Sequence, residues 1–224
     1  MITVDDDDDN DDELFESGTI DYRQFFKLVT FGGDSAATKD LIKFKLSDED
    51  FDVDTRLSGW CGYDEGITPI MIFAKPEIRK ILIKGGAFVS AKSEYSGYTP
   101  LMYAQMHTKN LYGTDSWFDS SSEENLQDSL LSSQILIDAK ADVNDRDYEG
   151  CTALFYASTR EQVNLLIRAG ANASIVNDFG ITAGEQPQLD RELSAYLCSL
   201  ALLTVVNSNV VENPINPIKI RKRL

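Results

Sequence analysis

The stretch that decides the fold is Gly97-Tyr98-Thr99-Pro100-Leu101-Met102-Tyr103-Ala104, because related segments occur elsewhere in the chain. These are Gly66-Ile67-Thr68-Pro69-Ile70-Met71-Ile72-Phe73-Ala74 and Gly150-Cys151-Thr152-Ala153-Leu154-Phe155-Tyr156-Ala157. A fourth start, Gly180-Ile181-Thr182-Ala183, loses the pattern after its threonine. A motif that returns at intervals of about 30 residues, once with an insertion of roughly 20, indicates a chain built from repeats.

Each of the three full segments is followed by a second recurring block, an aliphatic triplet that leads into small residues. The blocks start at Ile81-Leu82-Ile83, Ile135-Leu136-Ile137 and Leu165-Leu166-Ile167. We expect each triplet to end a helix, with Gly86 and Gly170 supplying a left-handed cap that turns the chain outward. Lys140 occupies the same place in the third block, so we expect a strained or altered turn there.

The paired motif resembles the ankyrin-repeat family, whose repeats open with Thr-Pro-Leu-His-x-Ala and contain two helices and a β-turn. The resemblance implies an all-α solenoid of about five helix-turn-helix repeats, including irregular N- and C-terminal caps. The sequence departs from the family at the histidine, which is replaced by Met71, Met102 and Phe155. We expect this loss to weaken the tether between helix and turn.

The chemistry of the motif predicts where the first helix of each repeat begins. Thr68, Thr99 and Thr152 can each cap a helix, and proline is tolerated in the first turn because its missing N–H needs no partner there. Ala104 and Ala157 lie three residues after a leucine, which places both on the helical face that meets a neighbouring repeat. Alanine at that place keeps the two helices close.

The chain divides into an acidic, disordered head at 1–18, an ankyrin-repeat domain at 19–206 and a flexible basic tail at 207–224. The domain carries an insertion at about 107–124, between the two helices of the third repeat. Tyr22–Phe31 and Ala36–Leu46 are predicted to be an irregular first helix pair. A helical stripe is predicted to pack on the fourth repeat as the C-terminal cap: Leu189, Leu193, Tyr196, Leu197, Leu200 and Leu203. The basic residues 219–223 could fold against the acidic body, engage an acidic partner or act as a targeting signal.

The charge of the chain separates some classes of partner from others. With 37 acidic and 21 basic side chains the formal net charge is -16, which repels nucleic acids and anionic membranes and attracts basic proteins. The acidity could equally serve solubility alone. The start of the chain has no signal-peptide pattern, and polar residues interrupt the uncharged stretch at 193–211. We therefore expect a cytoplasmic protein that binds neither membrane nor nucleic acid.

The residues that catalysis needs are scarce. His107 is the one histidine, and Cys61, Cys151 and Cys198 are too widely spaced for a disulfide framework or a CxxC metal site. There is no phosphate-binding loop, dinucleotide fingerprint or nucleophile elbow. We expect no enzyme activity, no cofactor and no metal.

The candidate binding residues lie on the turns before each repeat glycine, which are the hairpin tips of an ankyrin fold. Family members usually bind through these tips and the concave face of the first helices. Aromatic and acidic residues on exposed turns are typical of interfaces, although some rings could fold back on their own hairpins. The predicted partner-binding residues are Trp60, Tyr63, Glu94, Tyr95, Asp147, Tyr148, Glu149, Asp178 and Phe179.

The insertion gives a possible second interface, because Tyr112, Trp117 and Phe118 are aromatic residues in a loop rich in small and acidic ones. The alternative is that these rings pack on the repeats.

Taken together, these features predict a protein-binding module, a monomer when free. It would bind, and neutralise or sequester, a basic or mixed-charge protein partner, as an immunity or inhibitor protein does. The alternatives are an adaptor or scaffold that joins two partners, and a secreted bacterial or viral ankyrin effector.

Overall fold

The computed structural model describes residues 22–57, 66–72, 75–106 and 123–212. The regular secondary structure in these ranges is helical, and they contain isolated β-bridges but no β-strand. This confirms the all-α prediction. The elements are α1 (Tyr22–Phe31), α2 (Ala36–Leu46), α3 (Pro76–Lys84), α4 (Pro100–Met106), α5 (Glu123–Asp138), α6 (Ala153–Tyr156), α7 (Arg160–Arg168), the 3-10 turn η2 (Ala183–Glu185) and α8 (Arg191–Glu212).

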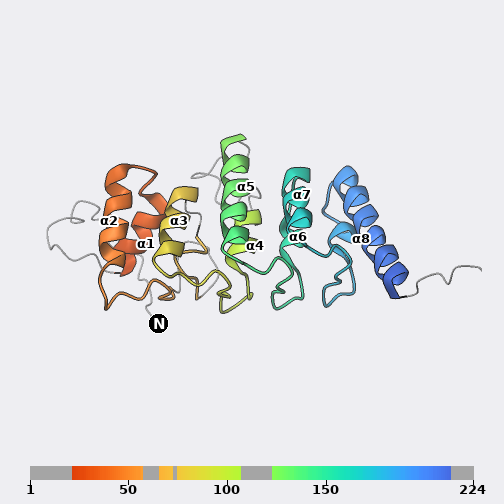
Figure 1. Ribbon diagram of the computed structural model, residues 1–224, viewed down its shortest axis with the longest axis horizontal. Coiled ribbons are helices and arrows are strands. Elements are labelled where there is room, and N and C mark those ends of the chain that lie inside the picture. The colour runs from red at the N-terminus through yellow and green to blue at the C-terminus, as the bar shows by residue number, and fades with distance from the viewer. Residues whose placement is uncertain (1–21, 58–65, 73–74, 107–122, 213–224) are drawn as a thin grey trace, which may run out of the picture.

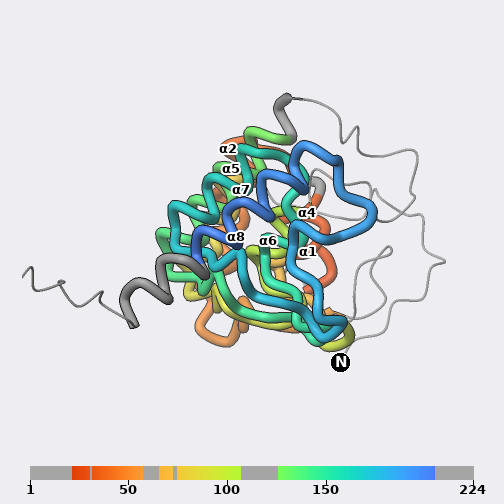
Figure 2. Tube along the Cα trace, turned by 90° about the vertical axis from the view of Figure 1, so that its right-hand side faces the viewer, coloured from red at the N-terminus to blue at the C-terminus, as the bar shows by residue number. Residues whose placement is uncertain are grey.

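The helices stand side by side in chain order, with hairpins between them along the lower edge of Figure 1. One row contains α2, α3, α5 and α7, each in contact with the next, and we call it the outer row. A second, inner row contains α4, α6 and η2 in the same kind of contact. The two rows contact each other where α4 packs on α5 and α6 packs on α7. At the two ends of the structure, α1 packs on α2 and η2 packs on α8. Figure 2 shows α4 and α6 on one side and α5, α7 and α8 on the other.

The sequence predicts that a helix begins at Thr68, and this prediction is wrong. Residues 66–72 form a turn closed by the Met71 N–H to the Thr68 carbonyl at 3.0 Å, and Ile67 pairs with Leu57. Ile70 and Ile72 are fully buried in this turn. Isoleucine loses side-chain freedom in a helix, whereas the matching segment at 100–106 has leucine, methionine, tyrosine and alanine.

The threonine caps are formed at one of the three predicted positions. The Thr99 hydroxyl accepts the Met102 N–H at 3.3 Å, but Thr152 caps α6 without a side-chain bond. A more complete N-terminal cap is found at the next helix, α7, which begins with a capping box. There the Thr159 side chain accepts the Gln162 N–H and the Gln162 side chain accepts the Thr159 N–H. Because Thr159 and Gln162 are three residues apart, the sequence contained this signal.

The residues that replace the family histidine are core residues, since Met71, Met102 and Phe155 are all buried. In two of the segments methionine makes a hydrogen bond at this position. The Thr68 N–H donates to the Met71 sulfur atom and the Thr99 N–H to the Met102 sulfur atom, each at 3.4 Å. Methionine can do this because its thioether is a weak acceptor on a flexible chain. Ala104 and Ala157 are both buried as predicted. The predicted helical position of Ala157 is wrong, however, because this residue follows the end of α6 and has extended backbone, with φ -65° and ψ 132°.

The turns after the outer helices follow the predicted geometry. Gly86 and Gly170 have φ angles of 95° and 97°, and Lys140 at the equivalent place has 71°. Among the described residues Lys140 is the one non-glycine with positive φ. The turn at Lys140 is therefore not altered: it has the hydrogen bonds of the two glycine turns, and the expected strain lies in the left-handed backbone of a residue with a side chain.

The C-terminal stripe is confirmed in part. Leu193 and Leu197 are buried, but Leu203 is 57% exposed and Leu189 precedes the helix. Helix α8 also continues to Glu212, past the domain boundary at 206 that the sequence predicts. In the described part of the chain no helix is both long enough and apolar enough to cross a membrane.

Candidate partner-binding surface

The hairpin tips at 147–150 and 177–180 are each built on a buried polar residue. The Asp147 carboxylate accepts the N–H groups of Glu149 and Cys151, both at 2.9 Å, and also the Tyr156 hydroxyl. Asn177 Oδ1 does the same for Phe179 and Ile181, at 3.1 and 3.2 Å. Asp147 is only 6% exposed, so its predicted place on a solvent-facing rim is wrong. It fixes the shape of the tip instead.

The tips are stacked so that each covers the one before it. Gly97 has a φ of 75°, and a Cβ there would lie 2.7 Å from Cδ1 of Tyr148. Glu94 lies on Gly66 and Asp178 lies on Gly150 in the same way. Two constraints therefore require glycine at these positions. The backbone is in the left-handed region, and a side chain from the following tip occupies the place of a Cβ atom.

These contacts correct the register of the tips. Tyr148 matches Glu94 and Asp178, and it does not match Tyr95, although Tyr95 and Tyr148 both stand two residues before a glycine. The tip that contains Tyr95 is one residue longer than the next tip, and sequence spacing counted from the glycine conceals this difference.

Three basic residues that the sequence analysis did not select join the tips. Arg56 Nη1 donates to the carbonyls of Gly66 and Lys92, both at 2.7 Å. Lys92 Nζ donates to the Arg146 carbonyl at 2.7 Å and pairs with Asp145 at 2.8 Å. Arg146 reaches the Val176 carbonyl at 2.9 Å and Asp178 at 3.2 Å. The sequence feature that could have identified these residues is a basic residue directly before the buried residue of the tip in three successive hairpins.

The aromatic tip residues are turned outward. Tyr95 is 80% exposed, Phe179 is 73% exposed and Tyr148 is 60% exposed. Glu94, Glu149 and Asp178 are exposed beside them. We call these six residues the tip surface. Backbone bonds hold it together, from the Tyr148 N–H to the Ser96 carbonyl at 3.0 Å and from the Asp178 N–H to the Glu149 carbonyl at 2.9 Å.

Other predicted interface residues cannot be placed on this surface. Trp60 and Tyr63 lie outside the described residues, as do Tyr112, Trp117 and Phe118 of the insertion.

A cluster of tyrosines lies beside the tips, next to the inner row. The Tyr98 ring is edge-on to Tyr103 and to Tyr156, with centroids 5.7 and 5.3 Å apart. Burial raises the pKa of Tyr98. Burial and the Asp147 carboxylate together raise the pKa of Tyr156. Both hydroxyls are therefore protonated at neutral pH, and the Tyr156 hydroxyl donates its proton to the Asp147 carboxylate.

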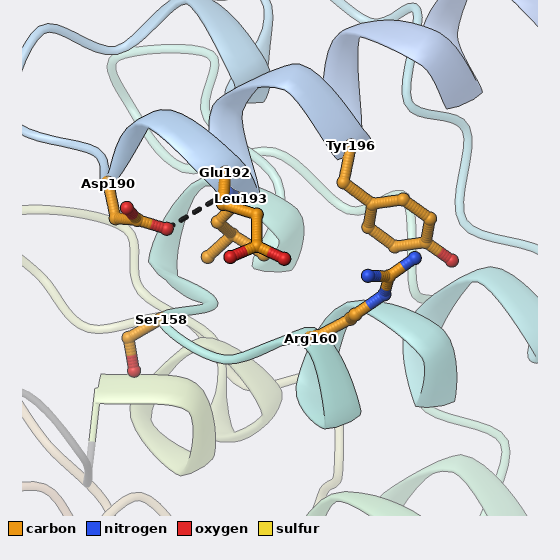
Figure 3. Close-up of a pocket in the computed structure, with 6 residues that line it drawn as sticks. All are labelled: Ser158, Arg160, Asp190, Glu192, Leu193 and Tyr196. Carbon is orange, nitrogen blue, oxygen red and sulfur yellow. Dashed lines mark hydrogen bonds between the residues drawn. The ribbon is translucent and has the colours of Figure 1, made fainter.

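A shallow pocket of about 190 Å³ lies where α7 and α8 begin (Figure 3). Two of its polar residues, Arg160 and Asp190, already have structural roles. The Arg160 guanidinium stacks on the Tyr196 ring, 4.1 Å from its centroid, and Asp190 caps α8 by accepting the Leu193 N–H at 3.0 Å. Small-molecule sites are usually larger, at about 300–1,000 Å³. The pocket is therefore a weaker candidate site than the tip surface.

The described ranges contain no group of three or more His, Cys, Asp or Glu side chains placed to hold a metal ion. His107 lies outside them. Burial raises the pKa of the Cys151 thiol to about 11, which keeps it in the unreactive protonated form at neutral pH.

Comparison with models of known protein families gives no match, and no curated protein matches the sequence either. The case for a function therefore rests on the repeats and on the tip surface.

Proposed function

We propose that the protein is a non-catalytic binding module of the ankyrin-repeat type. It sequesters a basic or mixed-charge protein through the tip surface and the adjoining inner face. Three features support the ankyrin assignment: the paired motif recurs in register, each unit contacts the next along the chain, and a hairpin follows α3, α5 and α7.

The observation that carries the proposal is the exposure of Tyr95, Tyr148 and Phe179 on a rigid support. Large aromatic side chains on turns lose little entropy on binding when the turn is already fixed. Here the turns are fixed by buried side chains and by bonds between neighbouring tips. Aromatic residues are also enriched among the side chains that dominate binding energy.

The charge of the tip surface supports a partner with basic residues. Arg56, Lys92 and Arg146 are engaged with backbone carbonyls of the tips themselves. Among the described ion pairs, none involves Glu94 or Glu149. Both residues are exposed, so their carboxylates can meet lysine or arginine on a partner, which would speed association at low salt.

The test uses the full chain as bait in three forms: the unchanged protein, a tip variant and a control. The tip variant carries Tyr95→Ala, Tyr148→Ala and Phe179→Ala. The control is Phe44→Ala, which removes an aromatic ring that is 68% exposed on α2. We expect one protein to be captured by the unchanged and control baits and lost by the tip variant.

With that partner purified, each tip substitution at a central position should weaken binding about 30-fold, equivalent to about 2 kcal/mol. Circular dichroism should show equal helix content for all three forms. Binding that survives in the tip variant but is lost with Trp117→Ala and Phe118→Ala would move the interface to the insertion and refute the assignment to the tips.

A further inference from the structure

The last hairpin of the row, at 169–180, lacks the cover that the earlier tips have. The glycines of the earlier tips are buried, each beneath a side chain from the following tip: Gly66, Gly97 and Gly150. Gly180 is exposed, and beyond its chain neighbours no atom of the described residues lies within 4 Å of the place where its Cβ would be. Phe179 beside it is 73% exposed. The side of this hairpin on which a further tip would lie is therefore open.

A backbone hydrogen bond that joins the earlier tips is also missing at this end. The carbonyl of Ser96 accepts the Tyr148 N–H at 3.0 Å, and the carbonyl of Glu149 accepts the Asp178 N–H at 2.9 Å. Both acceptors stand directly before a repeat glycine, and Phe179 is their equivalent in the last tip. Its carbonyl accepts no hydrogen bond from the described residues. Because a buried acceptor without a donor costs free energy, whatever covers this tip has to bring an N–H group.

The residue that begins the last hairpin differs from its equivalents. Arg56, Lys92 and Arg146 each donate to a backbone carbonyl of the following hairpin. The fourth position is Val176, which is apolar and 45% exposed. A molecule that covers this hairpin therefore meets an apolar side chain where each earlier hairpin presents a positive charge to its neighbour.

The charge around the open side favours a basic molecule. The last two hairpins, at 139–150 and 169–182, contain five acidic and two basic side chains. These are Asp142, Asp145, Asp147, Glu149 and Asp178 against Lys140 and Arg146. Arg146 is already engaged with the Val176 carbonyl and with Asp178. The local excess of negative charge therefore attracts cationic groups to this end of the row of tips.

We propose that the open side of the last hairpin is a binding site for a segment of the partner in which a large apolar residue is flanked by lysine or arginine. One backbone N–H of this segment donates to the Phe179 carbonyl. Its apolar side chain lies over Gly180 and against Val176. Its basic side chains face Asp178 and Glu149. That the segment belongs to a protein partner rests on the proposed function, whereas the site itself does not.

A titration of the full chain with a synthetic peptide tests the site without the partner. The probe is the capped peptide Lys-Lys-Phe-Val-Lys-Lys, and the control peptide, Lys-Lys-Ser-Ser-Lys-Lys, has the same charge. In two-dimensional NMR spectra, the amide signals of 174–182 should shift in a saturable way with the probe. The control peptide should bind at least about tenfold more weakly, because it buries no large apolar side chain. The signals of 94–97 should not shift, since Tyr148 covers that tip.

Two lysine variants separate the site from general attraction between opposite charges. Val176→Lys restores the positive charge of the other hairpins, so it should weaken binding of the probe at least about tenfold. Leu131→Lys is the matched control, because it makes the same change of charge at a residue of α5 that is also 45% exposed. It should leave the affinity within about twofold, since charges that are far apart are screened.

Equal binding of the two peptides, or an equal loss in the two lysine variants, would overturn the proposal, because net charge alone would then explain the binding. Shifts at 174–182 on dilution without peptide would assign the open side to a second copy of the chain. The same shifts in a variant with Lys222→Glu and Arg223→Glu, again without peptide, would assign it to the chain's own end. Either result would also overturn the proposal.

The partner captured by the baits gives a separate readout. Val176→Lys should weaken its binding, whereas Leu131→Lys should not. If Val176→Lys has no effect while the tip variant still loses the partner, the proposed function stands and the inference about the open side is refuted. If no captured protein depends on the tips, the proposed function fails, and the peptide titration still decides whether the site exists.

Discussion

At the turn after α5, Lys140 adopts the left-handed conformation that Gly86 and Gly170 adopt after α3 and α7. A residue with a side chain costs about 1–2 kcal/mol in the left-handed region of backbone conformation. Glycine avoids this cost but loses more conformational entropy on folding, so the net gain from glycine is smaller. We expect Lys140→Gly to raise the free energy of unfolding by about 1 kcal/mol, measured by urea titration. Gly170→Lys is the matched control, because a Cβ there meets open space and only the backbone opposes it. It should lower stability by a similar amount, and a shift of the same sign in both variants would contradict this account.

Cys151 gives the protein a dependence on alkaline pH. Its pKa is raised to about 11 by burial, whereas an unfolded thiol titrates near about 8.5. The folded state therefore retains the proton longer, and this contribution to stability is complete below about pH 8.5 and is lost as the pH rises to 11.

We expect the urea midpoint to fall between pH 8 and pH 10.5, and to fall less in Cys151→Ala. The variant should retain part of the fall, because the raised pKa values of Tyr98 and Tyr156 act in the same direction. An equal fall in both proteins would show that the thiol has no part in it.

At the scale of the elements, the sequence predicted most where local signals and packing agree. The helices Tyr22–Phe31 and Ala36–Leu46 have the predicted ends. The failure at Thr68 arose because the repeat motif is kept while the isoleucines around it favour a buried turn. The spacing of the motif cannot show which of the two effects is stronger.

The candidate site was predictable to a similar degree. The exposed rings of Tyr95, Tyr148 and Phe179 follow from their place on the turns. The burial of Asp147 does not, because a carboxylate on a turn can face solvent or bond to the backbone of its own turn. The ties made by Arg56 and its equivalents depend on the distance between neighbouring hairpins, which only the folded chain defines.

The contact between inner helices should respond to a change in volume. Ala104 lies in α4, Ala157 directly follows α6, and both are buried. Ala104→Leu or Ala157→Leu should therefore overpack its surroundings and cost about 1–3 kcal/mol. Ala195→Leu is the control, since Ala195 is exposed on α8, and surface changes usually stay within about 0.5 kcal/mol. The comparison can be made by thermal unfolding, and equal melting temperatures for all three variants would mean that the helical register is wrong.

At the scale of the whole molecule, the main contacts of each unit within the described ranges are with its neighbours in the row. In such an arrangement stability is a sum of local terms, so the row can open in part. The place to expect this is residues 66–84, where a turn replaces the inner helix and α3 alone continues the outer row. Helices α1 and α2 reach the rest of the chain chiefly through this unit and through hairpin bonds such as that from the Phe88 N–H to Asp54.

We therefore expect native-state hydrogen exchange to be faster in α1 and α2 than in α5 and α7, because opening at the turn releases the first two helices without disturbing the others. Ile70→Ala, which removes a fully buried side chain from the turn, should speed exchange in α1 and α2 and leave α7 nearly unchanged. Leu154→Ala, a truncation of an equally buried side chain in α6, should instead speed exchange in α6 and α7. If both variants raise exchange uniformly along the chain, the protein unfolds as one cooperative unit and the turn at 66–72 is as strong a link as the helices.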